Sequence, residues 1–161
     1  MAVLSAGILL YRQTDAAEPE VWIAHMGGPF WARKDAAAWS IPKGEYQPGE
    51  DPFDAARREF AEEIGVPAPE ADYQLLGEFR QPSGKVVTVF AAEADLAVRQ
   101  VVSNTFELEW PKGSGQLREF AEVDDARWVT LAEARVKLVR GQLPVLEALV
   151  ELLRGEERLG R

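Results

Sequence analysis

Runs of apolar and β-branched residues alternate along the chain with short clusters of Gly, Pro, Asp and Asn. Short runs of this kind, bounded by turn-forming residues, predict β-strands. The predicted strands cover residues 2–11, 20–25, 73–80, 85–93, 105–110 and 126–129. No basic segment precedes the first run, and the run is too short to span a bilayer, so we interpret it as a buried strand.

The strongest helical signal covers residues 52–64. Asp51 can cap this helix, Pro52 fits its first position, and Gly65 suits the left-handed conformation that often follows a last helical residue. Projected at about 100° per residue, the apolar residues form one narrow stripe, which predicts the buried face. The stripe consists of Phe53, Ala56, Phe60 and Ile64.

Two further helices are predicted near the C-terminus. The run TLAE, residues 130–133, is a capping box that opens a helix predicted to end at Gly141, and Pro144 starts a last helix over roughly residues 144–154. No internal repeat, low-complexity tract or flexible linker divides the sequence, so residues 1–161 are predicted to form a single domain. Strands mixed with few helices predict an α+β fold.

Composition narrows the classes of function. The formal net charge is −9, which disfavours nucleic acid and anionic membrane surfaces as partners. With no cysteine and one histidine, the sequence offers no disulfide framework, thiol nucleophile or zinc-finger spacing. The lack of cysteine suits a reducing compartment, and we expect a cytoplasmic location.

Three glutamates gather beside the apolar stripe of helix 52–64. Glu59, Glu62 and Glu63 are offset from that stripe by roughly a third of a turn. Glu59 and Glu63 are like-charged neighbours one turn apart, and Arg58 can offset only part of the repulsion. A divalent cation would offset the rest. The helix alone also allows the alternative that this is a solvated acidic face.

These glutamates belong to a longer pattern, G-x5-E-x7-R-E-U-x-E-E-x-G-U, in which U is a bulky apolar residue. Every specified position is matched, by Gly44, Glu50, Arg58, Glu59, Phe60, Glu62, Glu63, Gly65 and Val66. Through this complete Nudix box the chain resembles the Nudix hydrolase family. The resemblance implies a Nudix-type αβα sandwich with a mixed β-sheet. It also implies hydrolysis of the diphosphate linkage in a nucleoside diphosphate derivative.

The resemblance further implies a metal cofactor, Mg²⁺, with Mn²⁺ as the alternative. Mg²⁺ prefers oxygen ligands and is commonly held by a few carboxylates together with substrate phosphates. In the family, the backbone carbonyl at the position of Lys43 often joins the carboxylates, while Arg58 of the catalytic motif ties the preceding loop to the helix through Glu50. The carboxylates expected to hold the metal are Glu59, Glu62 and Glu63.

The general base of the expected reaction has two candidates. A metal-activated water would attack one phosphorus, and a carboxylate would accept its proton. Glu59 is one candidate. Family members often supply another ligand or base from a later loop, where this sequence offers Glu119 and Glu122. Of these two we favour Glu122 as the additional ligand or base, because its position six residues before Trp128 resembles family members in which a loop glutamate precedes a strand tryptophan. The choice between Glu59 and Glu122 as the base stays open, and the alternative for the loop is an acidic surface segment.

Substrate contacts are expected from the segment that runs from the end of the second predicted strand, at His25, to the box. Its basic residues, which could contact substrate phosphates, are His25, Arg33, Lys34 and Lys43. Lys43 is favoured because PKG resembles the box entry of family members that act on dinucleoside or inositol polyphosphates. The aromatic residues Phe30, Trp31 and Trp39 could stack a base or cover a sheet edge.

These observations predict a Mg²⁺-dependent Nudix hydrolase acting on a small-molecule nucleotide. The leading substrates are dinucleoside polyphosphates and nucleoside triphosphates. The alternative is a non-catalytic nucleotide-sensing module on the same fold, which the intact glutamate set disfavours. The apolar face of the last predicted helix could support a homodimer or pack on its own sheet.

Overall fold

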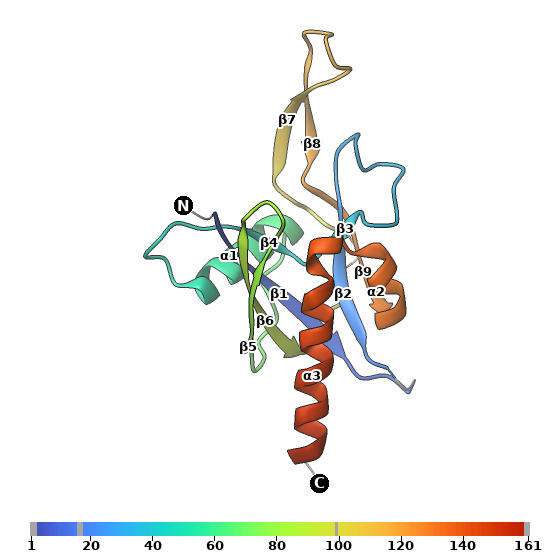
Figure 1. Ribbon diagram of the computed structural model, residues 1–161. Helices are drawn as coiled ribbons and strands as arrows, with labels where there is room; N and C mark the ends of the chain where they lie inside the picture. The colour runs from blue at the N-terminus through green and yellow to red at the C-terminus, as the bar shows by residue number, and fades with distance from the viewer. Residues whose placement is uncertain (1–2, 16–17, 99, 160–161) are drawn as a thin grey trace.

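The computed structural model describes residues 3–15, 18–98 and 100–159 (Figure 1). The strands are β1 (Leu4–Arg12), β2 (Glu20–Met26), β3 (Trp39–Ser40), β4 (Lys43–Glu45), β5 (Gln74–Arg80), β6 (Val86–Glu93), β7 (Thr105–Glu109), β8 (Leu117–Ala121) and β9 (Val123–Thr130). The helices are α1 (Pro52–Ile64), α2 (Leu131–Lys137), the 3₁₀ turn η1 (Arg140–Gln142) and α3 (Leu143–Leu159). Among the described residues, no helix is both long and apolar enough to cross a lipid bilayer.

Strand β1 lies at the centre of a mixed seven-stranded sheet. It pairs in parallel with β6 over Leu4–Tyr11, and β5 follows β6 in antiparallel orientation. On its other side, β1 pairs first with β4 and then, at its end, with β2. Strand β2 carries β3 and β9. Strands β7 and β8 form a separate hairpin, which projects from the body of the molecule in Figure 1.

Each face of the sheet is covered by helices. Residues of β1 alternate between the two faces, so that Ile8 and Leu10 pack with the buried side of α1, whereas Leu9 and Tyr11 pack with α2 and α3. The two cores confirm the predicted αβα sandwich with a mixed sheet. They also hold α1 rigidly against the sheet, which matters because α1 carries the three glutamates.

The bounds and caps of α1 are as predicted. The Asp51 side chain accepts a hydrogen bond from the backbone N–H of Asp54 at 3.0 Å, and Gly65 ends the helix with a φ of 92°. The predicted stripe is buried at Ala56, Phe60 and Ile64. Phe53 is partly exposed and instead packs against other aromatic rings.

The second predicted helix is too long. The capping box is present in full, but α2 ends at Lys137 and not at Gly141. The chain leaves the helix because Leu138 turns extended, buries its side chain and forms a bridge with Trp39. The last helix starts one residue earlier than predicted and continues to Leu159.

The strand predictions miss three short or polar strands. Strands β3 and β4 are very short, and β8 has the polar sequence LREFA on the exposed hairpin. Strand β9 begins at Val123, before the predicted residue 126, because its first residues pair with the end of β2. Ala2, the first residue of the predicted N-terminal strand, lies outside the described residues.

We expect Phe60→Ala to lower the free energy of unfolding by about 3–5 kcal/mol, because it leaves a cavity under α1. The ring is 0% exposed and lies 5.6 Å from the ring of Trp22, measured between centroids. Phe30 is 59% exposed, so Phe30→Ala is the matched control, with an expected cost of about 1 kcal/mol or less. Chemical denaturation measures both; equal losses would contradict the packing argument.

Candidate active site

The carboxylate of Glu59 lies directly against the backbone of β4. A Cβ placed on Gly44 would be 2.0 Å from Oε2 of Glu59 and 2.1 Å from its carboxyl carbon. The side chain of Glu59 is only 15% exposed. Glycine at position 44 is therefore what allows α1 to bring this carboxylate onto the strand. The first residue of the box has a steric role that its spacing alone does not reveal.

The carboxylate of Glu63 is held at the neighbouring residue. The backbone N–H of Lys43 donates a hydrogen bond to Oε2 of Glu63 at 3.3 Å. Lys43 pairs with Gly7, and a Cβ on Gly7 would lie 2.8 Å from the Cβ of Lys43. The Lys43 side chain thus leaves β4 on the face opposite the Glu59 contact. Burial, and then the charge of Lys85, lower the pKa of Lys43.

Arg58 connects the box loop to α1. One of its terminal nitrogens lies 3.2 Å from Oε1 of Glu50, 3.5 Å from the backbone oxygen of Glu45 and 3.5 Å from Oε1 of Glu59. The guanidinium therefore joins both ends of the loop to the helix and partly neutralises Glu59. The supporting role of Arg58 and Glu50 stays a prediction.

A chain of backbone hydrogen bonds carries Glu122 to the same place. The N–H of Asn104 donates to the carbonyl of Glu62, and the N–H of Glu122 donates to the carbonyl of Asn104, each at 2.9 Å. The carbonyl of Glu122 then accepts from the N–H of Gly27 at 2.8 Å. Sequence reasoning missed Asn104, because it contributes only backbone groups here and no side-chain motif signals them.

The two downstream glutamates are now distinguished by their surroundings. Glu119 lies on β8, where its carboxylate accepts a hydrogen bond from the Thr105 hydroxyl. Glu122 is exposed at the junction of β8 and β9. Its charge raises the pKa values of Glu59 and Glu63, although it is a minor cause in each case. Glu122, and not Glu119, thus belongs electrostatically to the carboxylate cluster.

Burial raises the pKa values of Glu59 and Glu63. The pKa of Glu63 is raised to about 8, mainly by burial, against an opposing hydrogen bond and charge from Lys43. The side chain keeps some exposed area, but protein atoms surround its carboxyl group. The pKa of Glu59 is raised by burial and then by the charge of Glu62. A cation near these groups would favour their ionised forms.

The donor set fits a hard cation bound with an open coordination sphere. Among the described residues, no three acidic or histidine side chains converge closely enough to form a closed metal site. Mg²⁺ does not need one, since it keeps several waters and takes phosphate oxygens as ligands. The carboxylates on α1 repel one another, and the charge of Glu122 adds to this repulsion. Their oxygens are the ligand atoms that Mg²⁺ prefers.

The predicted phosphate-binding residues at the end of β2 and in the loop after it differ in their surroundings. His25 is buried, with Nδ1 lying 2.7 Å from Oδ1 of Asp124 and Nε2 lying 2.7 Å from the backbone oxygen of Lys34. Because both ring nitrogens are engaged, the predicted phosphate contact of His25 gains no support from the geometry. Arg33 and Lys34 are exposed, and the ammonium of Lys34 lies 5.4 Å from the centroid of the Trp31 ring.

The aromatic residues of this loop and of β3 also differ in their surroundings. Trp39 is 3% exposed, and its indole N–H donates to Asp35 at 3.0 Å. Trp31 packs against the core beside α2 and α3. Phe30 remains exposed and contacts Trp110 of the hairpin edge-on, with 5.6 Å between ring centroids.

A family model described as the NUDIX domain matches residues 1–149, which include the sheet, α1 and the whole carboxylate cluster. The chain belongs to the Nudix family. The intact box and the family match identify it as a Nudix pyrophosphohydrolase. No curated protein matches its sequence.

Solved structures share the fold at low sequence identity. A Caenorhabditis elegans Ap4A hydrolase in a binary complex is 21% identical, with a TM-score of 0.61, over 94% of this chain and 98% of that one. The NUDIX domain of Shewanella oneidensis NrtR, complexed with ADP ribose, is 19% identical, with a TM-score of 0.65, over 95% and 89%. The C-terminal domain of mouse MUTYH, complexed with human PCNA, is 19% identical, with a TM-score of 0.61, over 96% and 91%.

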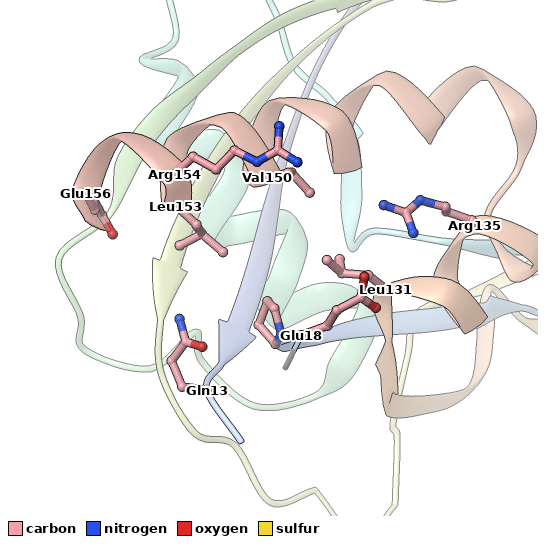
Figure 2. A pocket seen from close by; sticks show the side chains of 9 residues that line it. Gln13, Glu18, Leu131, Arg135, Val150, Leu153, Arg154 and Glu156 are labelled. Carbon is pink, nitrogen blue, oxygen red and sulfur yellow. The ribbon is translucent and has the colours of Figure 1, made fainter. Parts of the chain in front are cut away.

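A cavity of about 620 Å³ lies outside this Nudix site, between α2, α3 and the turn before β2 (Figure 2). Its lining combines Arg135 and Arg154 with Glu18, Glu156 and apolar side chains. None of these residues belongs to the carboxylate cluster. The size of a cavity therefore does not show where the Nudix site of this protein lies.

We expect Gly44→Ala to weaken binding of Mg²⁺ or Mn²⁺ about ten-fold or more, because its Cβ displaces the Glu59 carboxylate. The displaced group is the end of a flexible side chain, so the unfolding free energy should change far less than the metal affinity. Gly155→Ala is the control, since a Cβ there meets no atom within 4 Å. Calorimetric titration measures the affinities; wild-type affinity in Gly44→Ala would contradict the steric role.

The raised pKa of Glu63 predicts a pH-dependent stability in the metal-free protein. The folded protein holds the Glu63 proton up to about pH 8, whereas the unfolded chain releases it near 4.5. Between these values the unfolded state binds fewer protons, so this group lowers the unfolding free energy as the pH rises from about 4.5 to about 8. The unfolding free energy of Glu63→Gln should therefore fall less than that of wild type as the pH rises from about 4.5 to about 8.

Denaturation at about pH 5 and about pH 8.5, in the presence of a chelator, measures this difference. Glu147→Gln is the matched control, because Glu147 is 69% exposed and lies 3.8 Å from Arg135. In the control, the unfolding free energy should change with pH as it does in wild type. If the unfolding free energies of wild type and Glu63→Gln change equally with pH, burial of Glu63 does not cause the pH dependence.

Proposed function

We propose that residues 1–161 act as one Mg²⁺-dependent domain that cleaves the diphosphate linkage of a nucleoside diphosphate derivative. Dinucleoside polyphosphates and nucleoside triphosphates are the leading substrates. The observation that supports this proposal best is that Glu59 and Glu63 lie against β4, with Glu122 near enough for its charge to raise the pKa values of both. The solved structures of an Ap4A hydrolase and of an ADP-ribose complex are consistent with this substrate class.

In the proposed reaction, the metal would be held by Glu59, Glu62, Glu63 and the Lys43 carbonyl, with help from Glu122. When bound, Mg²⁺ would supply charge neutralisation at the phosphate oxygens and lower the pKa of a water. Gly44 and the Lys43 N–H fix the carboxylates on α1 before substrate arrives. Preorganised charges of this kind avoid the cost of reorganising them during the reaction.

Two carboxylates remain candidates for the base that takes the proton from the attacking water. Glu59 is largely buried and lies 3.5 Å from the Arg58 guanidinium, which stabilises its ionised form. Glu122 is exposed, and its backbone is fixed at both its N–H and its C=O. Either position suits a general base, and single substitutions separate them. Arg33 and Lys34 are proposed to attract the substrate phosphates from the exposed loop.

We expect a Glu62→Gln, Glu63→Gln double variant to lose turnover by at least about 10²-fold, because it removes two carboxylates from the metal site. Purified protein with Mg²⁺ or Mn²⁺ would be given nucleoside triphosphates, dinucleoside polyphosphates and ADP ribose, with products identified by mass spectrometry. Glu59→Gln and Glu122→Gln, compared over a range of pH, identify the base. Glu119→Gln is the matched control, because its carboxylate is engaged within the hairpin.

Hydrolysis of one substrate class by wild type, lost in the double variant and kept in Glu119→Gln, would support the proposal. Failure to hydrolyse any of these compounds with either metal would contradict it. Nucleotide binding without turnover would then favour the non-catalytic nucleotide-sensing alternative.

A further inference from the structure

A short connector, residues 102–104, lies against the C-terminal end of α1 just before β7 begins. The last carbonyls of a helix have no partner within the helix itself. Here the N–H of Val102 donates to the carbonyl of Ile64 at 3.0 Å, and the N–H of Asn104 donates to that of Glu62 at 2.9 Å. The connector is therefore fixed to the helix that carries the three glutamates.

Gly65, which ends α1, allows the connector to approach this closely. A Cβ on Gly65 would lie 2.6 Å from the carbonyl oxygen of Val102 and 2.9 Å from its Cβ. The φ of Gly65 is 92°, which residues with a side chain rarely adopt. This glycine of the box therefore has two structural roles: it terminates the helix, and it leaves room for the connector.

The hydroxyl of Ser103 holds the peptide group that follows Glu122. It accepts a hydrogen bond from the N–H of Val123 at 3.1 Å and donates one to the carbonyl of Asn104 at 2.8 Å. Val123 is only 6% exposed, so its N–H has little access to water as an alternative partner. The carbonyl of the same peptide group, that of Glu122, accepts from the N–H of Gly27. Both polar atoms of this peptide group are thus engaged by other segments.

The peptide group that precedes Glu122 is held by the same connector. Its N–H donates to the carbonyl of Asn104 at 2.9 Å, the same oxygen that accepts from the Ser103 hydroxyl. Peptide groups are planar, so holding the two on either side of a Cα fixes the direction in which its Cβ leaves the backbone. The carboxylate of Glu122 can therefore move only through the side-chain torsions.

This direction matters because Glu122 supplies the one carboxylate of the proposed metal site that does not come from α1. Its charge raises the pKa values of Glu59 and Glu63, as expected of a nearby carboxylate. The connector is bonded to α1 on one side and to the backbone around Glu122 on the other. A change in the connector would therefore change the distance between this carboxylate and those of the helix.

We propose that Ser103 is a positioning residue for Glu122, and that its hydroxyl fixes where this carboxylate lies relative to the glutamates of α1. The inference rests on the proposed function, because it assigns a role within the same metal site. Ser103 acts through the backbone and supplies no ligand atom itself. Loss of its hydroxyl leaves the N–H of Val123 without its acceptor and frees the peptide group after Glu122 to rotate.

The test compares Ser103→Ala with wild type in turnover and, separately, in metal binding. Turnover is measured with Mg²⁺ on nucleoside triphosphates and dinucleoside polyphosphates, and metal affinity by calorimetric titration with Mn²⁺. The kcat, the Mn²⁺ affinity or both should fall about ten-fold, according to whether Glu122 acts as base, ligand or both. KM should change by about two-fold or less, because the contacts made by the substrate itself stay in place.

Ser114→Ala is the matched control. At the tip of the β7–β8 hairpin, the hydroxyl of Ser114 accepts from the N–H of Gln116 at 3.2 Å, so this variant removes the same kind of hydrogen bond. Its kcat and Mn²⁺ affinity should stay at the wild-type values. Ser103→Thr keeps the hydroxyl and should restore most of the lost function, whereas Ser103→Val has a methyl group in its place and should not.

A double-mutant cycle with Glu122→Gln distinguishes a positioning role from a general loss of structure. If Ser103 acts through Glu122, Ser103→Ala should lower kcat and Mn²⁺ affinity by less than about two-fold further once this carboxylate is gone. Circular dichroism shows whether each variant is folded under the assay conditions. The comparison of Ser103→Thr with Ser103→Val takes the place of Ser103→Ala if that variant does not fold.

The outcomes separate this inference from the proposed function. Equal losses from Ser103→Ala in the wild-type and Glu122→Gln backgrounds would overturn the inference, because Ser103 would then not act through Glu122. Wild-type kcat and Mn²⁺ affinity in Ser103→Ala would also overturn it, while leaving the hydrolase intact.

If wild type hydrolyses none of these nucleotides, the proposed function fails and the Mn²⁺ affinities decide on Ser103. A loss of affinity in Ser103→Ala that disappears in the Glu122→Gln background would support the positioning role. Wild-type affinity in Ser103→Ala would overturn it.

Discussion

The close approach of α1 to β4 is the constraint on which the rest of this site depends. The carboxylate of Glu59 occupies the space where any other residue at position 44 would carry its Cβ. This contact requires α1 to be held tightly, which the buried ring of Phe60 and the core beneath it achieve. It also brings Glu63 within hydrogen-bonding distance of the Lys43 N–H. Packing of an apolar face therefore sets the positions of charged groups on the next face.

This arrangement works against the stability of the metal-free protein. Burial raises the pKa values of Glu59 and Glu63, so ionising them costs free energy that neither Arg58 nor the Lys43 N–H fully offsets. An enzyme site commonly keeps such unfavourable charges, because a ligand or ion relieves them. A cation bound beside these carboxylates would favour their ionised forms, so relief of this cost would add to the binding energy of the cation.

Local signals predicted what lies within one segment. The caps at Asp51 and Gly65 and the spacing of the box were enough to define α1 and its glutamates. Contacts between distant segments were not predictable in this way. The helix predicted to reach Gly141 ends at Lys137, because Leu138 pairs with Trp39, which lies far earlier in the sequence. Trp39 itself was an open choice between stacking a base and covering the sheet, and it is buried.

Sequence spacing could favour Glu122 as a candidate, but it could not show where this residue lies in the fold. Its link to α1 runs through the backbone of Asn104, and its link to the loop after β2 runs through Gly27. Backbone groups leave no trace in side-chain patterns, because every residue except proline carries the same donor and acceptor. The same links join the base of the hairpin to α1 and to the loop after β2. The glutamates of α1 are thus encoded locally by the box, whereas the position of Glu122 beside them depends on pairing between segments that are distant in the sequence.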